Sequence, residues 1–131
     1  MINKNTYGKH EKLKSRKLID EVFNKGKVVK AYPLRLHYLI HEHREYNNLQ
    51  AGVSVSKRNF KKATNRNRVK RLLREAYRLQ NKELKMWLKG QNKKLALMII
   101  FGNNELPDFS ITMKRTNQVL TKLLNRIAED N

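Results

Sequence analysis

The sequence predicts one small α+β domain, an α/β sandwich of helices on a sheet, in the order α-β-β-β-α-β-α. In three segments apolar residues recur at spacings of three and four, which is typical of helices with one buried face. In two other segments apolar and polar residues alternate, which is typical of half-buried strands. A chain of 131 residues, of which 39% are hydrophobic, can form one core, so we expect a single domain over residues 1–131.

The first predicted helix follows a basic N-terminal segment. Residues 1–12 carry no apolar stripe, so we expect a flexible basic arm there. Ser15 is placed to cap the helix, and Gly26 is placed to end it. The apolar face between them consists of Leu18, Ile19, Val22 and Phe23. Phe23 could pack in the core or offer its ring to a ligand, and the pattern leaves both roles open.

Strands are predicted on both sides of the polar segment HEHREYNN, with a shorter one around KVVKA. In PLRLHYLIH, alternation separates Leu34, Leu36, Tyr38 and Ile40 from Arg35, His37, Leu39 and His41. In QAGVSVSK, it separates Ala51, Val53 and Val55 from Gly52, Ser54 and Ser56. The second face of QAGVSVSK is small and polar, so we expect a shallow floor on which a sugar-phosphate backbone could lie.

A long helix is predicted from about Thr64 to Leu88, with Thr64 or Asn65 near its start. At about 100° per residue, its apolar side carries Val69, Leu72, Leu73 and Ala76. The opposite side carries Asn67, Lys70, Arg71, Arg74 and Arg78, flanked by Arg66 and Arg68. KKLALMIIF then predicts a strand buried on both faces. A last helix, capped by Ser110 or Thr112, has its stripe at Met113, Thr116, Leu120, Leu123, Leu124 and Ile127.

The charge of the chain indicates a polyanionic partner. Thirty Lys and Arg against eleven Asp and Glu give a net charge of +19 and a pI near 10.4. Residues 57–78 hold ten basic side chains, and Glu75 is the only acid among them. Like charges at helical neighbour spacings repel each other, and a single acid cannot neutralise them, so an ordinary solvated face explains the pattern poorly. We therefore expect this helix to bind phosphates.

The order of the elements favours RNA as the source of those phosphates. A helix-turn-helix protein would need a second helix just before the long one, joined to it by a tight turn. A strand and the basic loop SKRNFKKATN stand there instead. A basic helix beside an open sheet face suits irregular or single-stranded RNA, so we expect no DNA partner.

The segments GVSVSKR and NRNRVKRLLREAYR resemble the signature of the bacterial ribonuclease P protein family, an Arg-Asn-Arg helix start after a Ser-Val-Ser-Lys strand. IDEVFNKG is similar to the first helix of that family, and the resemblance extends over residues 12–128. It implies a small mixed sheet in which the long basic helix makes a left-handed crossover between parallel strands. That hand is an exception to the general rule for crossovers and comes from the resemblance alone.

The resemblance also implies a function. Proteins of this family assist a catalytic RNA subunit, which requires Mg²⁺, in the endonucleolytic removal of the 5′ leader of precursor tRNA. Contact with the RNA subunit is implied for Arg66, Asn67, Arg68, Lys70, Arg71 and Arg74. A cleft for the leader is implied for Ile19, Phe23, His37, Ser54, Lys57 and Arg58. Because the family commonly has aromatic residues in place of Ile19 and His37, we expect stacking to depend chiefly on Phe23.

Two other functions fit parts of the pattern. A structural RNA-binding protein, such as a ribosomal component, shares the charge, but ribosomal proteins often place basic residues in extended tails rather than in a folded helix. A protein-only nuclease needs clustered carboxylates to hold metal ions, and here the only adjacent pairs are at 20–21 and 129–130. We therefore expect an accessory subunit of a ribonucleoprotein endonuclease, with no catalytic residue in the polypeptide.

We expect neither a metal site nor a membrane segment. His37, His41 and His43 share a parity and could bind zinc together, but the strand is expected to end near His41. Cysteine is absent, which excludes disulfides and thiol chemistry. The longest apolar run, LALMIIF, is too short to cross a bilayer, and the N-terminus shows no apolar signal segment. We expect a cytoplasmic protein that binds no cofactor by itself.

Overall fold

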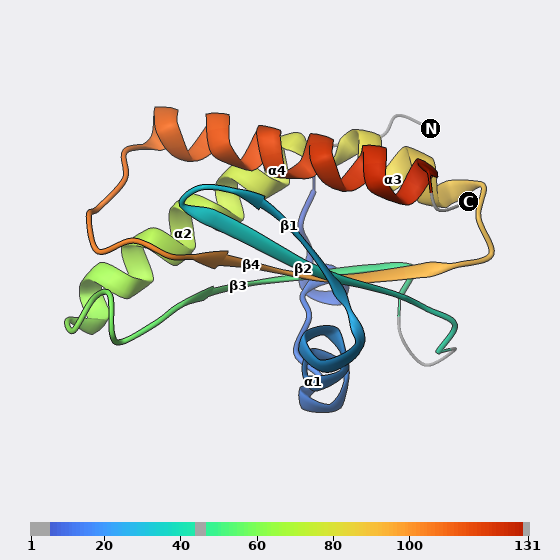
Figure 1. The fold of residues 1–131 in the computed structure, drawn as a ribbon, viewed down its shortest axis with the longest axis horizontal. Coiled ribbons are helices and arrows are strands. Elements are labelled where there is room, and N and C mark those ends of the chain that lie inside the picture. Colours follow the sequence, from blue (N-terminus) through green and yellow to red (C-terminus); the bar gives the residue numbers. More distant parts are fainter. Residues whose placement is uncertain (1–5, 44–46, 130–131) are drawn as a thin grey trace.

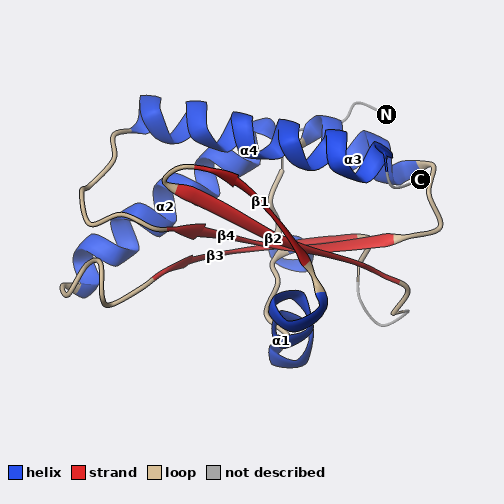
Figure 2. Ribbon diagram, viewed as in Figure 1, coloured by secondary structure: helices blue, strands red, loops and turns tan. Residues whose placement is uncertain are grey.

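A four-stranded sheet lies between two unequal helical layers. The computed structural model describes residues 6–43 and 47–129. Its helices are the 3-10 helix η1 (Lys9–Glu11), α1 (Arg16–Lys25), α2 (Ala63–Gln80), α3 (Lys82–Lys89) and α4 (Phe109–Glu129). Its strands are β1 (Lys27–Ala31), β2 (Leu34–His41), β3 (Leu49–Val55) and β4 (Lys94–Phe101). The helices α2, α3 and α4 cover one face of the sheet, and α1 lies on the other (Figures 1 and 2).

The strands lie in the order β1-β2-β4-β3. β2 runs antiparallel to both β1 and β4, whereas β3 and β4 are parallel. A parallel pair requires a crossover connection, and α2 with α3 provides it. The prediction of one α+β domain with a small mixed sheet is therefore confirmed, including the short strand around KVVKA.

The alternation in β2 correctly predicted which of its apolar side chains enter the larger core. The larger core, under α2, α3 and α4, contains Leu34, Leu36 and Tyr38 of β2. β4 is central and buried on both faces, as its apolar run predicted. Its Leu95, Leu97 and Ile99 lie in the larger core, and its Ala96 and Met98 lie in the smaller core with Leu18 and Val22 of α1.

The two ends of α1 are confirmed by their hydrogen bonds. The Ser15 hydroxyl accepts a hydrogen bond from the Leu18 amide at 3.3 Å, and the Gly26 amide donates to the Val22 carbonyl at 3.0 Å. A Cβ on Gly26 would lie 2.2 Å from the Val22 carbonyl oxygen and 2.4 Å from that of Tyr38. Only glycine therefore lets α1 turn into β1 at this point.

The long helix predicted over residues 64–88 is wrong in one respect, because it is interrupted at Asn81. Asn81 has φ −90° and ψ 2°, outside the helical region, and α3 begins directly after it. Its side chain is fully buried and donates from Nδ2 to the Thr6 carbonyl at 2.8 Å. Behind the break, Leu84 and Leu88 of α3 reach the larger core. The observed order is therefore α-β-β-β-α-α-β-α.

The predicted cap of the last helix is also wrong. α4 begins at Phe109, and neither Ser110 nor Thr112 is its cap. The Ile111 amide instead donates to the Asp108 carboxylate at 2.8 Å. α2 begins at Ala63, which agrees with the predicted start near Thr64, and no side chain caps it.

The expectation of a flexible arm does not hold for residues 6–12. Tyr7 donates a hydrogen bond to the Ala51 carbonyl, and its ring meets that of Tyr77 edge-on at 5.1 Å. Glu11 forms an ion pair of 2.7 Å with Lys85. Lys12 adds a parallel bridge to Ala51 at the outer edge of β3. This part of the expected arm is docked on β3, α2 and α3, and residues 1–5 lie outside the described residues.

Candidate nucleic-acid interface

A row of side chains crosses all four strands on the α1 side of the sheet. Lys30 of β1 is the register partner of Arg35 of β2, Arg35 is paired with Ile100 of β4, and Ile100 with Ser54 of β3. Paired residues point to the same face, and the neighbours of these four point into the larger core. Strands lie about 4.8 Å apart, so this cross-strand row spans roughly 14 Å. Lys30 and Arg35 are exposed, and Ile100 and Ser54 are half-buried.

Phe23 stands beside the cross-strand row at the end of α1. Its ring centroid lies 4.9 Å from that of His37, and the two planes are tilted by 55°. His37 is two residues from Arg35 on β2 and shares its face. Phe23 is 41% exposed. Of the two roles that the sequence left open, core packing is therefore excluded, because the ring stands at the open side of the sheet.

The electrostatic environment of His37 is positive. Burial of the imidazole, followed by the charges of Arg35 and Lys30, lowers the pKa of His37 below its ordinary value. The free protein therefore disfavours the protonated ring. A bound anion would favour the protonated ring and would reverse this shift.

The polar floor on β3 is smaller than the alternation predicted. Gly52 is buried, and a Cβ there would lie 2.5 Å from the Met98 sulfur. Met98 of the neighbouring strand β4 therefore covers Gly52, which no period-two pattern can reveal. Ser54 is half-buried and Ser56 is exposed, so the open part of β3 begins at Ser54.

Two of the predicted leader residues lie in the turn next to the cross-strand row, and a third supports α1. Lys57 and Arg58 are exposed in the turn that follows β3, three and four residues after Ser54. The turn is held by the Asn59 amide, which donates to the Ser56 hydroxyl at 3.3 Å. Ile19 is half-buried against the smaller core and fixes α1 on the sheet. The α1 face is hereafter defined as Phe23, His37, the cross-strand row, Lys57 and Arg58.

Three residues of this surface were not predicted as site residues, namely Lys30, Arg35 and Ile100. Arg35 shares the parity of His37 in the sequence, which was the available signal. Lys30 and Ile100 join them only through the pairing of β1 with β2 and of β2 with β4. That pairing could not be deduced from one strand at a time.

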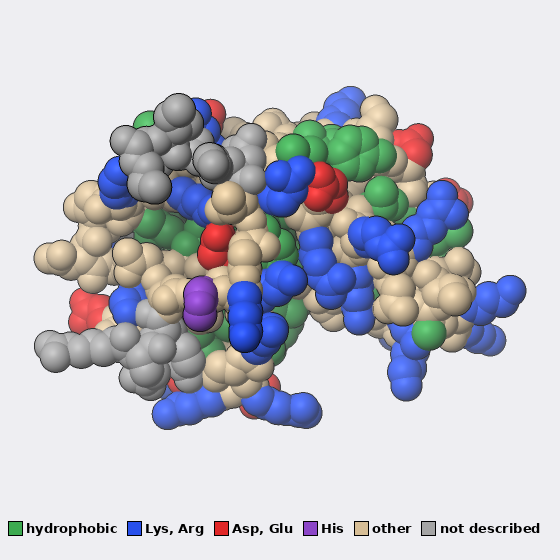
Figure 3. Space-filling model, turned by 180° about the vertical axis from the view of Figure 1, so that it is seen from behind, with side chains coloured by type: hydrophobic (Ala, Val, Ile, Leu, Met, Phe, Trp, Pro, Cys, Tyr) green, Lys and Arg blue, Asp and Glu red, His purple; other side chains and the backbone are tan. Residues whose placement is uncertain are grey.

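The second surface is the α2 basic face, defined as Asn67, Arg68, Lys70, Arg71 and Arg74. All but the half-buried Lys70 are exposed, because Val69, Leu73, Ala76 and Tyr77 turn the opposite side of α2 into the core. In the described part of the chain, none of these cations has a carboxylate within ion-pair distance. Seen from behind, basic side chains are far more prominent than acidic ones (Figure 3).

Arg66 and Arg78 at the two ends of this helix are engaged within the protein. Arg66 donates from Nη1 to the carbonyls of Phe60 and Lys61 at 2.8 and 2.9 Å, so it secures the loop before α2. Arg78 binds both carboxylate oxygens of Glu75, at 3.0 and 2.5 Å. This hydrogen bond from Arg78 lowers the pKa of Glu75. The sequence grouped both arginines with the free cations, because it does not show which way they fold back.

The three histidines that were considered as zinc ligands do not converge. His37 lies against Phe23, whereas the ring of His41 lies 5.1 Å from that of His43. His43 in turn contacts the Glu21 carboxylate at 3.2 Å. Across residues 6–43 and 47–129, no three His, Asp or Glu side chains are grouped so as to hold a metal ion. No helix in these ranges is both long and apolar enough to span a membrane.

Comparison with known proteins shows the family of this chain. The sequence matches the family described as Ribonuclease P over residues 7–128. The chain belongs to the ribonuclease P protein family. It is thus a protein subunit of ribonuclease P, an RNA-binding protein of tRNA processing, and the family implies association with the ribonuclease P RNA. The ribosomal alternative is not favoured.

Individual ribonuclease P proteins are similar to this chain in sequence and in fold. The ribonuclease P protein component of Porphyromonas gingivalis (strain ATCC 33277) is 42% identical over 132 residues, covering 98% of this chain and 92% of the relative. That of Chlorobium phaeobacteroides (strain DSM 266) is 30% identical over 129 residues, covering 91% and 88%. The solved RNase P protein of Staphylococcus aureus has a TM-score of 0.58 at 20% identity, covering 91% and 96%. This last likeness supports the fold.

Proposed function

We propose that this ribonuclease P protein binds its RNA subunit through the α2 basic face and the 5′ leader of precursor tRNA through the α1 face. The RNA subunit, with the Mg²⁺ that it holds, hydrolyses the phosphodiester bond. The protein contributes affinity for the precursor and stabilises the assembled RNA. The observation that carries the proposal is the cross-strand row beside an exposed aromatic ring.

The chemistry of the α1 face suits a short single-stranded segment. Phe23 presents a ring on which a base can stack, and Lys30, Arg35, Lys57 and Arg58 can neutralise phosphates along the strand. Stacking tolerates every base, and phosphate contacts carry no sequence information. Such a surface therefore suits leaders of many different sequences.

The α2 basic face suits a folded RNA instead. Its cations project from one rigid helix and lack carboxylate partners among the described residues. Lys57 and Arg58 lie on the loop that leads from β3 into α2, so the two surfaces meet at this loop. A precursor tRNA bound on the α1 face would therefore be held next to the RNA subunit.

Four carboxylates make contacts within the protein that stabilise its fold. Glu11 pairs with Lys85, Glu21 with His43 and Glu75 with Arg78. Asp108 caps α4. Metal-dependent hydrolysis by a polypeptide uses carboxylates gathered around metal ions, and these are dispersed and engaged. This dispersion supports the assignment of hydrolysis to the RNA subunit.

Equilibrium binding tests the leader assignment. Precursor and mature tRNA are titrated with the RNA subunit alone and with the assembled ribonucleoprotein. We expect the protein to increase the affinity for precursor tRNA much more than that for mature tRNA. An equal gain for both would mean that the protein acts only by stabilising the RNA.

Cleavage by the separate components tests the division of labour. The RNA subunit alone should cleave precursor tRNA when Mg²⁺ is raised, because Mg²⁺ supplies part of the counter-charge that the protein provides. The purified protein alone should leave the precursor intact at every Mg²⁺ concentration. Cleavage by the protein without RNA would overturn the assignment.

A further inference from the structure

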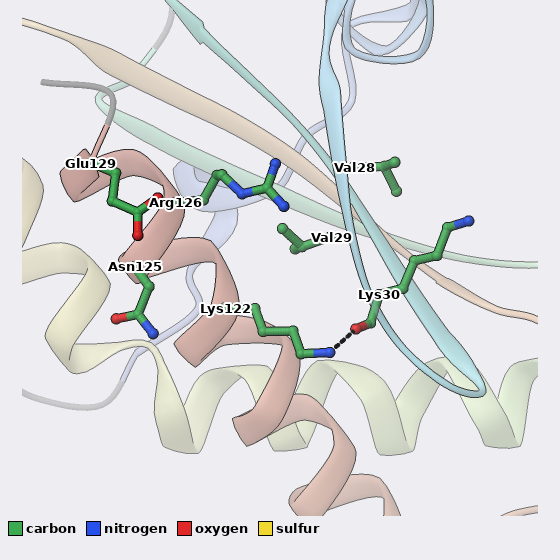
Figure 4. Close-up of a pocket in the computed structure, with 7 residues that line it drawn as sticks. All are labelled: Val28, Val29, Lys30, Lys122, Asn125, Arg126 and Glu129. Atoms are coloured by element: carbon green, nitrogen blue, oxygen red, sulfur yellow. Dashed lines mark hydrogen bonds between the residues drawn. The ribbon is translucent and has the colours of Figure 1, made fainter.

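A second groove lies at the opposite end of the cross-strand row from Lys57 and Arg58, between β1 and α4. Its first part, with a volume of about 450 Å³, is lined by Val29 and Lys30 of β1 and by Lys122, Asn125 and Arg126 of α4 (Figure 4). Its second part, of about 620 Å³, shares Lys122 and is lined by Tyr32, Arg115 and Gln118. We call the two together the β1–α4 groove.

The groove has the composition of a single-stranded RNA site. It contains four cations, Lys30, Arg115, Lys122 and Arg126, against the single acid Glu129. In Figure 4 the Arg126 side chain extends from α4 toward β1 beside Val29. Tyr32, in the turn after β1, is 73% exposed, so its ring is available for stacking.

Arg115 carries hydrogen-bonding capacity that the described residues do not use. It donates from Nη1 to the Gln118 side chain at 2.9 Å, which fixes the guanidinium at the wall of the groove. Its Nε is buried and makes no hydrogen bond within the described residues. A buried donor of this kind is costly unless a partner reaches it.

The open edge of β1 argues against an extended peptide as the occupant. Within the described residues β1 pairs only with β2, so its outer edge would be a template for an added strand. Lys122, however, donates from Nζ to the Lys30 carbonyl at 2.6 Å and so occupies that edge (Figure 4). An added strand would have to break this bond, whereas a phosphate could sit beside the ammonium group without breaking it.

The groove continues the α1 face through one residue. The side chain of Lys30 begins the cross-strand row, and its carbonyl faces α4. β1 is the last strand on this side, about 4.8 Å from β2. A strand of RNA that crosses the row from Ser54 toward Lys30 therefore reaches the β1–α4 groove directly.

We propose that the β1–α4 groove binds the upstream nucleotides of long leaders, after the leader has crossed the α1 face. The inference rests on the proposed function, since it extends the path of the same strand. The affinity of the protein for precursor tRNA would then depend on the length of the leader. Short leaders end on the sheet, and longer ones gain phosphate contacts and a stacking ring beside α4.

Leader-length titration tests this inference in the assembled ribonucleoprotein. Precursor tRNAs with leaders of roughly 4 to 16 nucleotides span the range of site sizes that single-stranded nucleic acids occupy on one small binding domain. For the unaltered protein, we expect affinity to rise in two steps, first on the α1 face and then in the groove. Arg126→Ala should remove part of the second step and lower the salt slope for long leaders by about 0.7, the value for one phosphate contact on a single strand.

Lys114→Ala is the matched control, because Lys114 is an exposed cation on α4 outside the groove. It should leave the affinity at every leader length unchanged. Tyr32→Ala should weaken the long leader without changing the salt slope. A photoreactive nucleotide at the distal end of a long leader should crosslink to the β1–β2 turn or to α4. Thermal melts of each variant verify that the fold is kept.

Three outcomes would overturn the inference. The first is a single step of affinity with leader length. The second is an Arg126→Ala variant that binds long leaders like the unaltered protein. The third is a loss with Arg126→Ala that is equal for long leaders, short leaders and mature tRNA, which would place the RNA subunit or the tRNA body in the groove. Failure of the proposed function would give a different result, because the first rise in affinity, which is assigned to the α1 face, would then be missing as well.

Discussion

The α2 basic face and the α1 face bind the same kind of ligand in our proposal but are built in opposite ways. On α2, all the side chains project from a single helix whose other side is buried in the larger core. On the α1 face, they come from α1, from all four strands and from the turn after β3. The first is a row of charges on one support, and the second combines charges, an imidazole and an exposed ring.

This difference predicts how each surface fails. Losing one cation from α2 removes one contact and leaves its neighbours in place. Losing the ring of Phe23 removes a contact that no other residue of the α1 face provides. Losing the support of α2 would affect the whole basic face together. The predictions below test this order.

The largest effect is expected from the buried support of α2. Leu73 is fully buried in the larger core, so Leu73→Ala should lower the free energy of unfolding by about 2 to 5 kcal/mol. Leu72→Ala is the matched control, since Leu72 is half-buried and should cost clearly less. Urea unfolding of the free protein measures both. Equal losses would contradict the observed orientation of α2.

The next effect concerns Phe23. Phe23→Ala should weaken precursor tRNA binding by about 1 to 3 kcal/mol, the contribution of one stacked base, and leave mature tRNA binding unchanged. Phe109, which is 44% exposed at the start of α4, provides a control of the same residue type. Phe109→Ala should bind both tRNAs like the unaltered protein. An equal loss for precursor and mature tRNA with Phe23→Ala would exclude a leader contact.

Substitutions of Arg71 and Arg66, both on α2, should affect different properties of the protein. Arg71→Ala should keep the stability of the protein and reduce the salt slope of RNA-subunit binding by about 0.7 to 0.9 for one lost phosphate contact. Arg66→Ala should also destabilise the free protein, by about 1 to 3 kcal/mol, because two carbonyls before α2 lose their donor. Unfolding curves and salt titrations separate the two effects. A fully stable Arg66→Ala protein would show that these bonds do not secure the loop.

The smallest effect is a pH dependence at His37. Burial, then Arg35 and Lys30, lower its pKa in the free protein, and a leader phosphate nearby would raise it again. Binding then takes up a proton, so the preference for precursor over mature tRNA should grow as the pH falls from 8 toward 6. A change of one pKa unit corresponds to about tenfold, which is the upper limit that we expect. His37→Gln should flatten this dependence in a binding assay, and an unchanged profile would mean that no phosphate lies near the ring.

The elements that the sequence predicted correctly depend on local signals. Ser15 and Gly26 act on the backbone within four residues, and the alternation in β2 follows from the two faces of a strand. The errors depend on distant partners. Asn81 interrupts the long helix where its side chain binds Thr6, and Met98 closes the floor over Gly52. No window of neighbouring residues contains either pair.

In the candidate site, too, features with a local cause were predicted and features that depend on distant partners were not. Exposure of Arg68, Arg71 and Arg74 followed from helical periodicity, because one side of α2 is apolar. The exposure of Phe23 and its contact with His37 required the packing of α1 on β2, and the role of Lys30 required the pairing of β1 with β2. Arg66 illustrates the limit, because its guanidinium turns back to the carbonyls of the preceding loop.

The docking of residues 6–12 has a consequence for folding during synthesis on the ribosome. The groups that hold residues 6–12 come much later in the chain: the Ala51 carbonyl is 44 residues after Tyr7, and the Lys85 ammonium is 79 residues after Thr6. At a synthesis rate of about 5 to 20 residues per second, the segment waits roughly 4 to 16 s for its last partner. Residues 6–12 are therefore fully held only after Lys85 has been synthesised.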